Sequence, residues 1–254
     1  MTSEQVGKEA FVRSLELDRD RVGDFDSHPF SIPAIRKLTR LELDARVTFL
    51  VGENGSGKST VVEGFAVAAG LNPEGGSQNF AFGTRASHSE LHEYLRLVRG
   101  IQRPATGYFL RAETFYNVAT QVEVLDREPS FGPELIGSYG GRSLHEQSHG
   151  ESFLSVVVNR FGPRGLYVLD EPEAALSVRG CLALLRRMHE LVTQGSQFLV
   201  ATHSPILLGF PDALIYTITE DGFEPTPYED SEQYTLTRSF LEDRRRFFRH
   251  LLSD

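Results

Sequence analysis

The stretch that decides the fold runs from residue 47 to residue 59 and reads VTFLVGENGSGKS. Its first five residues are an unbroken run of β-favouring side chains, typical of a strand buried on both faces. The next eight match the pattern G-x-x-x-x-G-K-[ST], and apolar residues at Val61, Val62 and Phe65 predict a helix that begins near Lys58. A strand, a glycine-rich turn and a helix in this order predict a loop whose N–H groups surround phosphates.

Each part of this loop has an expected role. Lys58 should reach the β- and γ-phosphates of a nucleotide, and the Ser59 hydroxyl should bind Mg²⁺. The alternative, a chance match in a glycine-rich turn, leaves the strand before it and the helix after it unexplained. The residues predicted to contact the nucleotide here are Gly52, Glu53, Asn54, Gly55, Ser56, Gly57, Lys58, Ser59 and Thr60.

A second buried strand ends in two acids. Residues 166–170 read LYVLD, and Glu171 and Pro172 follow directly. Asp170 is expected to hold Mg²⁺ through water, and Glu171 to polarise the attacking water as general base. An acidic turn after a strand is common by itself, so the prediction depends on the phosphate loop upstream.

Helices and strands alternate along most of the chain. This order predicts an α/β fold, a P-loop NTPase with a mainly parallel sheet covered by helices, whose ligands sit at the carboxyl ends of the strands. Strands are expected at 11–17, 108–110 and 198–202, and helices at 89–98, 114–125, 153–161 and 182–192. The segments 71–86 and 127–147, rich in Gly, Ser, Asn or Pro, are expected to be loops, the second of them exposed.

Three further sequence motifs lie between and after the two described above. They are QSHGE at 147–151, EAALS at 173–177 and ATHSP at 201–205. The set resembles the ATP-binding-cassette (ABC) ATPase superfamily, whose signature, D-loop and switch-histidine loop they match in turn. No guanine-reading [NT]KxD motif follows, so ATP is the expected nucleotide.

The resemblance implies further roles and a partner. Ser148 and Gly150 would contact a nucleotide from the signature helix, and His203 would contact the γ-phosphate during the reaction. ATP would join two copies of the chain into a homodimer with Mg²⁺ as cofactor, and Lys58, Glu171 and His203 would carry catalysis.

Within the superfamily the chain is more similar to the non-transporter branch. That branch contains chromosome-maintenance and recombination-repair ATPases and small predicted bacterial ATPases, and this chain resembles a compact member without coiled-coil arms. His149 replaces the first signature glycine, and Ser177 stands where the D-loop usually has Asp. Glu113 is either a magnesium-side ligand in place of the expected glutamine or the start of a helix. Phe30 is either an adenine-stacking side chain or a core residue.

The expected domain organisation is an ABC-type ATPase core over 1–205, with a helical signature region at about 85–160. Residues 206–254 would add a C-terminal strand and a helical accessory segment to the same domain. The predicted function is ATP binding and Mg-dependent hydrolysis that drives dimerisation. The alternatives are the nucleotide-binding subunit of an ABC membrane transporter and a nucleotide sensor that does not hydrolyse ATP.

The amino-acid composition limits the classes of function that are expected for this chain. The 254 residues are 40% hydrophobic and 24% charged, with a formal net charge of −9. This charge disfavours nucleic acid as a partner, and the arginine clusters at 96–103 and 244–249 are interpreted as solvated helix faces. Cys181 is the single cysteine, so no internal disulfide can form. Without an apolar run long enough for a membrane span or a signal peptide, a cytoplasmic protein with an unknown protein partner is expected.

Overall fold

The computed structural model describes residues 10–73, 76–77, 89–113, 115, 120, 124–126, 135–139 and 141–252. Within these residues the main sheet has seven strands in the order β10-β9-β3-β8-β7-β6-β4. The strands from β9 to β6 are parallel, and β10 and β4 pair antiparallel at the two edges. The bounds are β3 (Val47–Gly52), β4 (Gly76–Ser77), β6 (Thr106–Arg111), β7 (Gly165–Asp170), β8 (Gln197–Ala201), β9 (Leu214–Thr219) and β10 (Gly222–Pro225).

A smaller antiparallel sheet has the order β2-β1-β5. Its strands are β1 (Val12–Leu17), β2 (Arg40–Glu42) and β5 (Leu95–Arg99). The α-helices whose bounds lie within the described residues are α2 (Pro33–Lys37), α3 (Lys58–Ala68), α5 (His149–Arg160), α6 (Val178–Thr193), α7 (Pro205–Leu208), α8 (Glu232–Glu242) and α9 (Arg244–Leu251).

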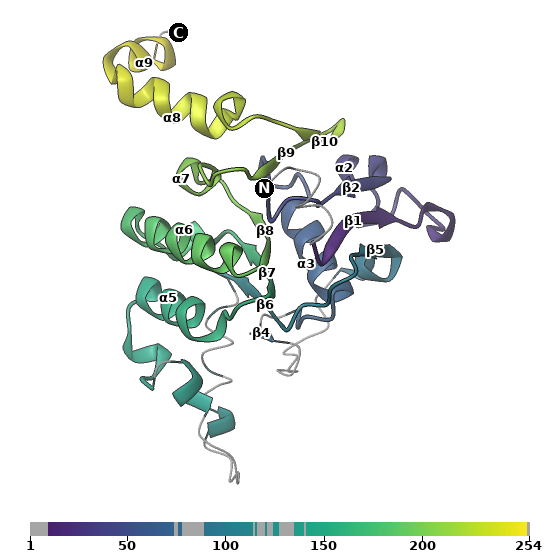
Figure 1. Ribbon diagram of the computed structural model, residues 1–254. Helices are drawn as coiled ribbons and strands as arrows, with labels where there is room; N and C mark the ends of the chain where they lie inside the picture. Colours follow the sequence, from purple (N-terminus) through teal and green to yellow (C-terminus); the bar gives the residue numbers. More distant parts are fainter. Residues whose placement is uncertain are drawn as a thin grey trace.

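The main sheet lies between two layers, as Figure 1 shows. One face is covered by α5, α6 and α7, and the other by α3 and the small sheet, while α8 and α9 lie at one end beyond β9 and β10. Alternate side chains of each strand enter different cores: Phe49 packs in the cluster under α5 and α6, and Leu50 packs in the cluster under α3. Because both faces are buried, the central strands read as unbroken apolar runs. The mainly parallel α/β sheet predicted from the sequence is confirmed.

The strand register brings several of the predicted site residues to one edge of the main sheet. Asp170, the last residue of β7, pairs with Arg111 of β6 on one side and with Ala201 of β8 on the other. In β3, Leu50 also pairs with Ala201, and Gly52 follows two residues later. The carboxyl ends of β3, β6, β7 and β8 therefore meet where ligands of such sheets bind.

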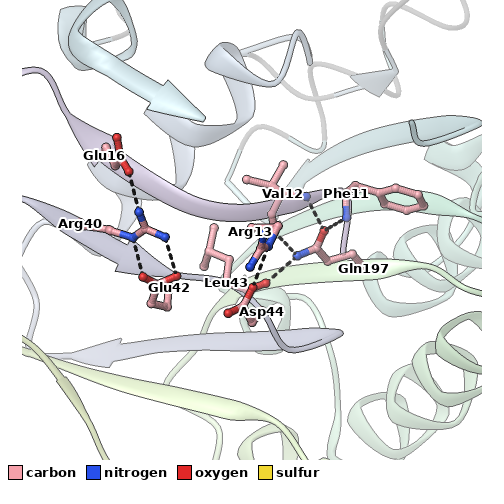
Figure 2. Close-up of polar contacts among 9 residues, drawn as sticks. All are labelled: Phe11, Val12, Arg13, Glu16, Arg40, Glu42, Leu43, Asp44 and Gln197. Atoms are coloured by element: carbon pink, nitrogen blue, oxygen red, sulfur yellow. Dashed lines mark hydrogen bonds and ion pairs between the residues drawn. The ribbon is translucent and has the colours of Figure 1, made fainter. Parts of the chain in front are cut away.

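A buried glutamine joins the small sheet to the main one, as Figure 2 shows. Gln197 begins β8 and is 3% exposed. Its Oε1 accepts hydrogen bonds from the N–H groups of Phe11 and Val12 at 3.0 Å each. Its Nε2 donates to the carbonyl oxygens of Val12 at 2.8 Å and Leu43 at 2.9 Å. All four hydrogen-bonding positions of this amide are thus satisfied, which a buried polar side chain requires.

Two sequence expectations are wrong. The segment expected as a helix at 89–98 forms a 3₁₀ turn (Glu90–Tyr94) and then β5, because Leu95 and Leu97 pair with β1 and turn toward the core under α3. The segment expected as an exposed loop contains 3₁₀ turns that bury Tyr139 and Leu144. Most of 74–88 and 114–134, which include parts of both predicted loops and of the predicted helix at 114–125, lies outside the described residues.

Candidate nucleotide-binding site

The glycine-rich loop between β3 and α3 has the expected place and shape. Gly57 caps α3 with φ +97°, a conformation that side-chain-bearing residues rarely adopt. A Cβ on Gly57 would lie 3.0 Å from a methyl group of Ile32, and one on Gly52 would lie 2.7 Å from the carbonyl oxygen of Ile218. The chain therefore requires glycine at both positions.

Lys58 begins α3 and points back into this loop. Its side chain is buried, and Nζ donates to the carbonyl oxygens of Gly52 at 2.8 Å and Glu53 at 2.9 Å. Burial lowers the pKa of Lys58, while the nearby carboxylates of Glu171 and Asp170 act in the opposite direction. The loop thus holds a buried ammonium next to inward-facing backbone, and such a group gains charge stabilisation when phosphates arrive.

Ser59 and Asp170 meet on the side of the loop that faces the next strands. The Ser59 hydroxyl donates to Oδ1 of Asp170 at 3.2 Å, and Asp170 is 3% exposed. Burial raises the pKa of the Asp170 carboxyl group, although Arg111 and Ser59 act against the rise. A hydroxyl and a carboxylate are the hard oxygen donors that Mg²⁺ prefers, so these two residues fit the ion that the sequence predicts.

Arg111 is a site residue that the sequence did not reveal. Its Nε donates to Oδ2 of Asp170 at 3.0 Å, and its Nη2 donates to Oε2 of Glu63 at 2.8 Å. Burial alone would lower the pKa of Arg111, but the two carboxylates outweigh this effect and raise it. A basic residue at the end of a strand is the only signal in the sequence, and it gains meaning only once β6 is known to pair with β7.

Glu171 and His203 face each other beyond Asp170. The distance from Oε1 of Glu171 to Nε2 of His203 is 3.7 Å, and both side chains are partly exposed. Glu171 adopts a left-handed conformation (φ +49°), and its N–H donates to the carbonyl oxygen of Ala201 at 2.9 Å. The N–H of His203 donates to Oε1 of Glu173, which ties the two loops together. Although the His203 side chain is partly exposed, its Nε2 is buried and has no hydrogen-bond partner among the described residues.

The signature segment forms the start of a helix. Ser148 caps α5, and its hydroxyl accepts a hydrogen bond from the N–H of Glu151, whose carboxylate binds the N–H of Ser148 in return. These bonds with Ser148 lower the pKa of Glu151. Gly150 faces the D-loop, where an added Cβ would lie 3.2 Å from the carbonyl oxygen of Ala175.

Two open cavities flank the phosphate-binding loop. One of about 450 Å³ is lined by residues 52–56, by the ends of α2 and β9 and by the start of α8. The other, of about 520 Å³, is lined by His28, Pro29, Ser59, Thr60, Glu63, Ser89, Glu90, Arg111 and Glu113. The described lining residues of both cavities exclude the 148–151 turn, and they also exclude Lys58, Asp170, Glu171 and His203. The contacts of Ser59 with Asp170 and of Glu171 with His203 are what group the predicted site residues.

One of the two questions that the sequence left open receives a structural answer. Phe30 is 2% exposed and lies edge-on to Tyr94 with ring centroids 4.9 Å apart, which confirms the core interpretation. Glu113 is exposed and lines the same cavity as Ser59 and Arg111. Among the described residues, no group of three or more His, Cys, Asp or Glu could hold a metal ion on its own, and no helix is long and apolar enough to cross a membrane.

Comparisons with known proteins agree with this geometry. Residues 24–125 match the model of a family described as an AAA domain. The chain is similar to the cytochrome c biogenesis ATP-binding export protein CcmA of Rhodopseudomonas palustris, with 29% identity over 166 residues, 62% of this chain and 78% of that protein.

Two solved structures are also similar. The SMC head domain from Thermotoga maritima is 17% identical, with a TM-score of 0.46 over 85% of this chain and 99% of that one. A dimeric bacterial ABC transporter cassette is 17% identical, with a TM-score of 0.44 over 74% and 87%. The chain has an ABC-like P-loop NTPase fold and is an ATP-hydrolysing P-loop NTPase.

Proposed function

We propose that ATP joins two copies of this chain and that hydrolysis separates them, so that the protein works as an ATP-driven switch. The observation that carries the proposal is the place of the signature helix. The N-terminus of α5, with Ser148 and Gly150, belongs to the helix layer on one face of the main sheet, whereas α3, which follows the phosphate-binding loop, covers the opposite face (Figure 1). The positive end of this helix would then serve a nucleotide bound to the other copy.

The roles within one site follow from the contacts. Lys58 and the N–H groups of the loop bind the β- and γ-phosphates. Ser59, and Asp170 through water, hold the Mg²⁺ that neutralises charge on the phosphate oxygens. Ser59 and Asp170 are directed toward each other, since the Ser59 hydroxyl donates to Asp170.

We assign the hydrolysis step to Glu171 and His203. Glu171 accepts a proton from the attacking water, and His203 donates a hydrogen bond to the γ-phosphate. The 3.7 Å between their side chains leaves them close enough to act on one water and one phosphate. The hydrogen bond from the Glu171 N–H to the carbonyl oxygen of Ala201 fixes the backbone that carries this carboxylate.

The Glu171→Gln variant tests this proposal. Without a base the variant should bind ATP but not hydrolyse it, and a long-lived dimer should form that size-exclusion chromatography detects with ATP and not with ADP. The Glu229→Gln variant, altered in an exposed 3₁₀ turn, is the matched control and should behave as wild type. Turnover by Glu171→Gln at the wild-type rate would remove Glu171 as the base.

A second candidate is favoured by the relative CcmA, whose name describes an ATP-binding export protein. In this case the chain would be the nucleotide-binding subunit of a membrane transporter. The spelling QSHGE at 147–151, in place of the LSGGQ common in transporters, supports the switch instead. Purification of the tagged chain from detergent-solubilised membranes separates the two candidates: an integral membrane protein retained in stoichiometric amount would support the transporter subunit.

A further inference from the structure

A positively charged side chain, Arg111, lies in the part of the site where Mg²⁺ is expected. Arg111 lies between two carboxylates, with Nε 3.0 Å from Oδ2 of Asp170 and Nη2 2.8 Å from Oε2 of Glu63. The side chains are 14%, 4% and 13% exposed, respectively, so water screens the three charges weakly.

The two oxygens of Asp170 have different partners. Oδ1 accepts from Ser59, the expected magnesium ligand, whereas Oδ2 accepts from Arg111. The carboxylate that a divalent cation needs is therefore partly neutralised before any metal arrives. Arg111 also lines the same open cavity as Ser59 and Glu63, so a metal that enters there approaches the guanidinium.

We propose that Arg111 weakens the binding of divalent cations to the nucleotide-free protein, so that Mg²⁺ enters together with ATP. The inference rests on the proposed roles of Ser59 and Asp170 at magnesium. Two like charges in one weakly screened cavity repel each other, and the repulsion extends over several ångströms. The phosphates of ATP bring enough negative charge to offset it, which makes metal binding conditional on nucleotide.

A different role for Arg111 predicts the opposite result. If the residue only braces β6, β7 and α3 through its ion pairs, its removal should leave Asp170 and Glu63 less well placed and should weaken metal binding. The direction of the change in metal affinity, measured without nucleotide, therefore separates a repelling charge from a brace.

The test is a titration with Mn²⁺ alone, followed by electron paramagnetic resonance of the free ion. Arg111→Gln should bind Mn²⁺ about tenfold more tightly than wild type or better, because a full charge has left the cavity. Arg111→Lys keeps the charge without the two-sided contact and should stay within about threefold of wild type. With a non-hydrolysable ATP analogue present, the difference between Arg111→Gln and wild type should shrink. Equal or weaker Mn²⁺ binding by Arg111→Gln would overturn the inference.

Two more variants keep the test decisive. If Arg111→Gln does not fold, the double variant Arg111→Gln/Glu63→Gln leaves no unpaired Glu63, and it should bind Mn²⁺ more tightly than Glu63→Gln alone; no gain would overturn the inference. Asp170→Asn should lose Mn²⁺ binding even with the ATP analogue. If it does not, the magnesium site itself has been assigned wrongly, which differs from a failure of the Arg111 inference alone.

Discussion

Lys58 shows how one residue prepares the site for its ligand. Its ammonium is removed from water and satisfied by two carbonyl oxygens of its own loop, an arrangement that leaves a buried positive charge without a hydrogen-bonded carboxylate. Phosphate oxygens can replace these carbonyls and form stronger, charge-assisted bonds. Lys58 is therefore expected to contribute much of the free energy with which the loop binds phosphates.

The Lys58→Ala variant should bind ATP about 10- to 100-fold more weakly, since hydrogen bonds to charged groups contribute about 1.5–3 kcal/mol. Equilibrium binding of a fluorescent ATP analogue measures the loss. Lys37→Ala is the matched control, because Lys37 lies on the surface, paired with Asp221, and should not affect binding. Unchanged affinity in Lys58→Ala would contradict the phosphate-loop assignment.

His203 should act on the reaction and not on binding. We expect His203→Ala to lower the rate of hydrolysis about 100-fold or more, as loss of a donor to developing charge does, while the affinity for ATP stays within about threefold of wild type. Single-turnover hydrolysis and equilibrium binding separate the two quantities. His189→Ala, an exposed histidine of α6, is the control. An equal loss of binding and hydrolysis would point to a structural histidine.

At this scale the sequence predicts some of the residues brought to the sheet edge and misses others. Lys58, Ser59 and Asp170 belong to local patterns, so their contacts could be anticipated. Arg111 and Glu63 follow no local pattern, because their role depends on the register between β6 and β7 and on the side of α3 that faces them. Such pairings are long-range properties of the fold.

Among the elements, β8 depends on Gln197 as much as on its apolar residues. Its buried amide accepts hydrogen bonds from the N–H groups of Phe11 and Val12. It also donates hydrogen bonds to the carbonyl oxygens of Val12 and Leu43. The small sheet therefore attaches to the main sheet through an amide, as Figure 2 shows, as well as through apolar packing.

Gln197→Leu should lower the free energy of unfolding by roughly 2–4 kcal/mol, because it leaves several buried backbone groups without partners. Urea unfolding followed by circular dichroism measures the change. Gln194→Leu, the same substitution at an exposed position after α6, should change stability by less than about 0.5 kcal/mol. Similar stabilities for the two variants would show that the amide contacts contribute little.

Element prediction succeeded where the local signal was unambiguous. The unbroken apolar run of β3 and the capped, amphipathic α6 were both anticipated, with bounds that differ from the structure by a few residues. The segment 89–98 carries apolar residues that suit either a helix or a strand, and pairing with β1 selects the strand in the structure. Tertiary pairing of this kind is not visible in a single sequence.

For the whole molecule, the question is which chain completes each site. Lys58, Asp170 and Glu171 come from one chain, in which Ser59, the residue after Lys58, donates to Asp170, the residue before Glu171. The outer face of the γ-phosphate would remain open to the N-terminus of α5 from a second copy. The interface would then be isologous, with one loop and one signature from each chain.

Mixing two inactive proteins, Lys58→Ala and Ser148→Arg, decides this question. In a mixed dimer one site has both defects, whereas the other combines an intact Lys58 with an intact Ser148 from the partner. Hydrolysis should therefore return on mixing, to at most about half the wild-type rate per mixed dimer if the sites act independently.

The matched control is a mixture of Lys58→Ala with Glu171→Gln. Because Lys58 and Glu171 belong to the same chain's half of a site, neither site of that mixed dimer is intact, and hydrolysis should stay absent. Recovery in the first mixture and none in the second would place the signature helix in trans. If mixed dimers with Ser148→Arg form and remain inactive, each chain completes its own site and the proposed sandwich is wrong.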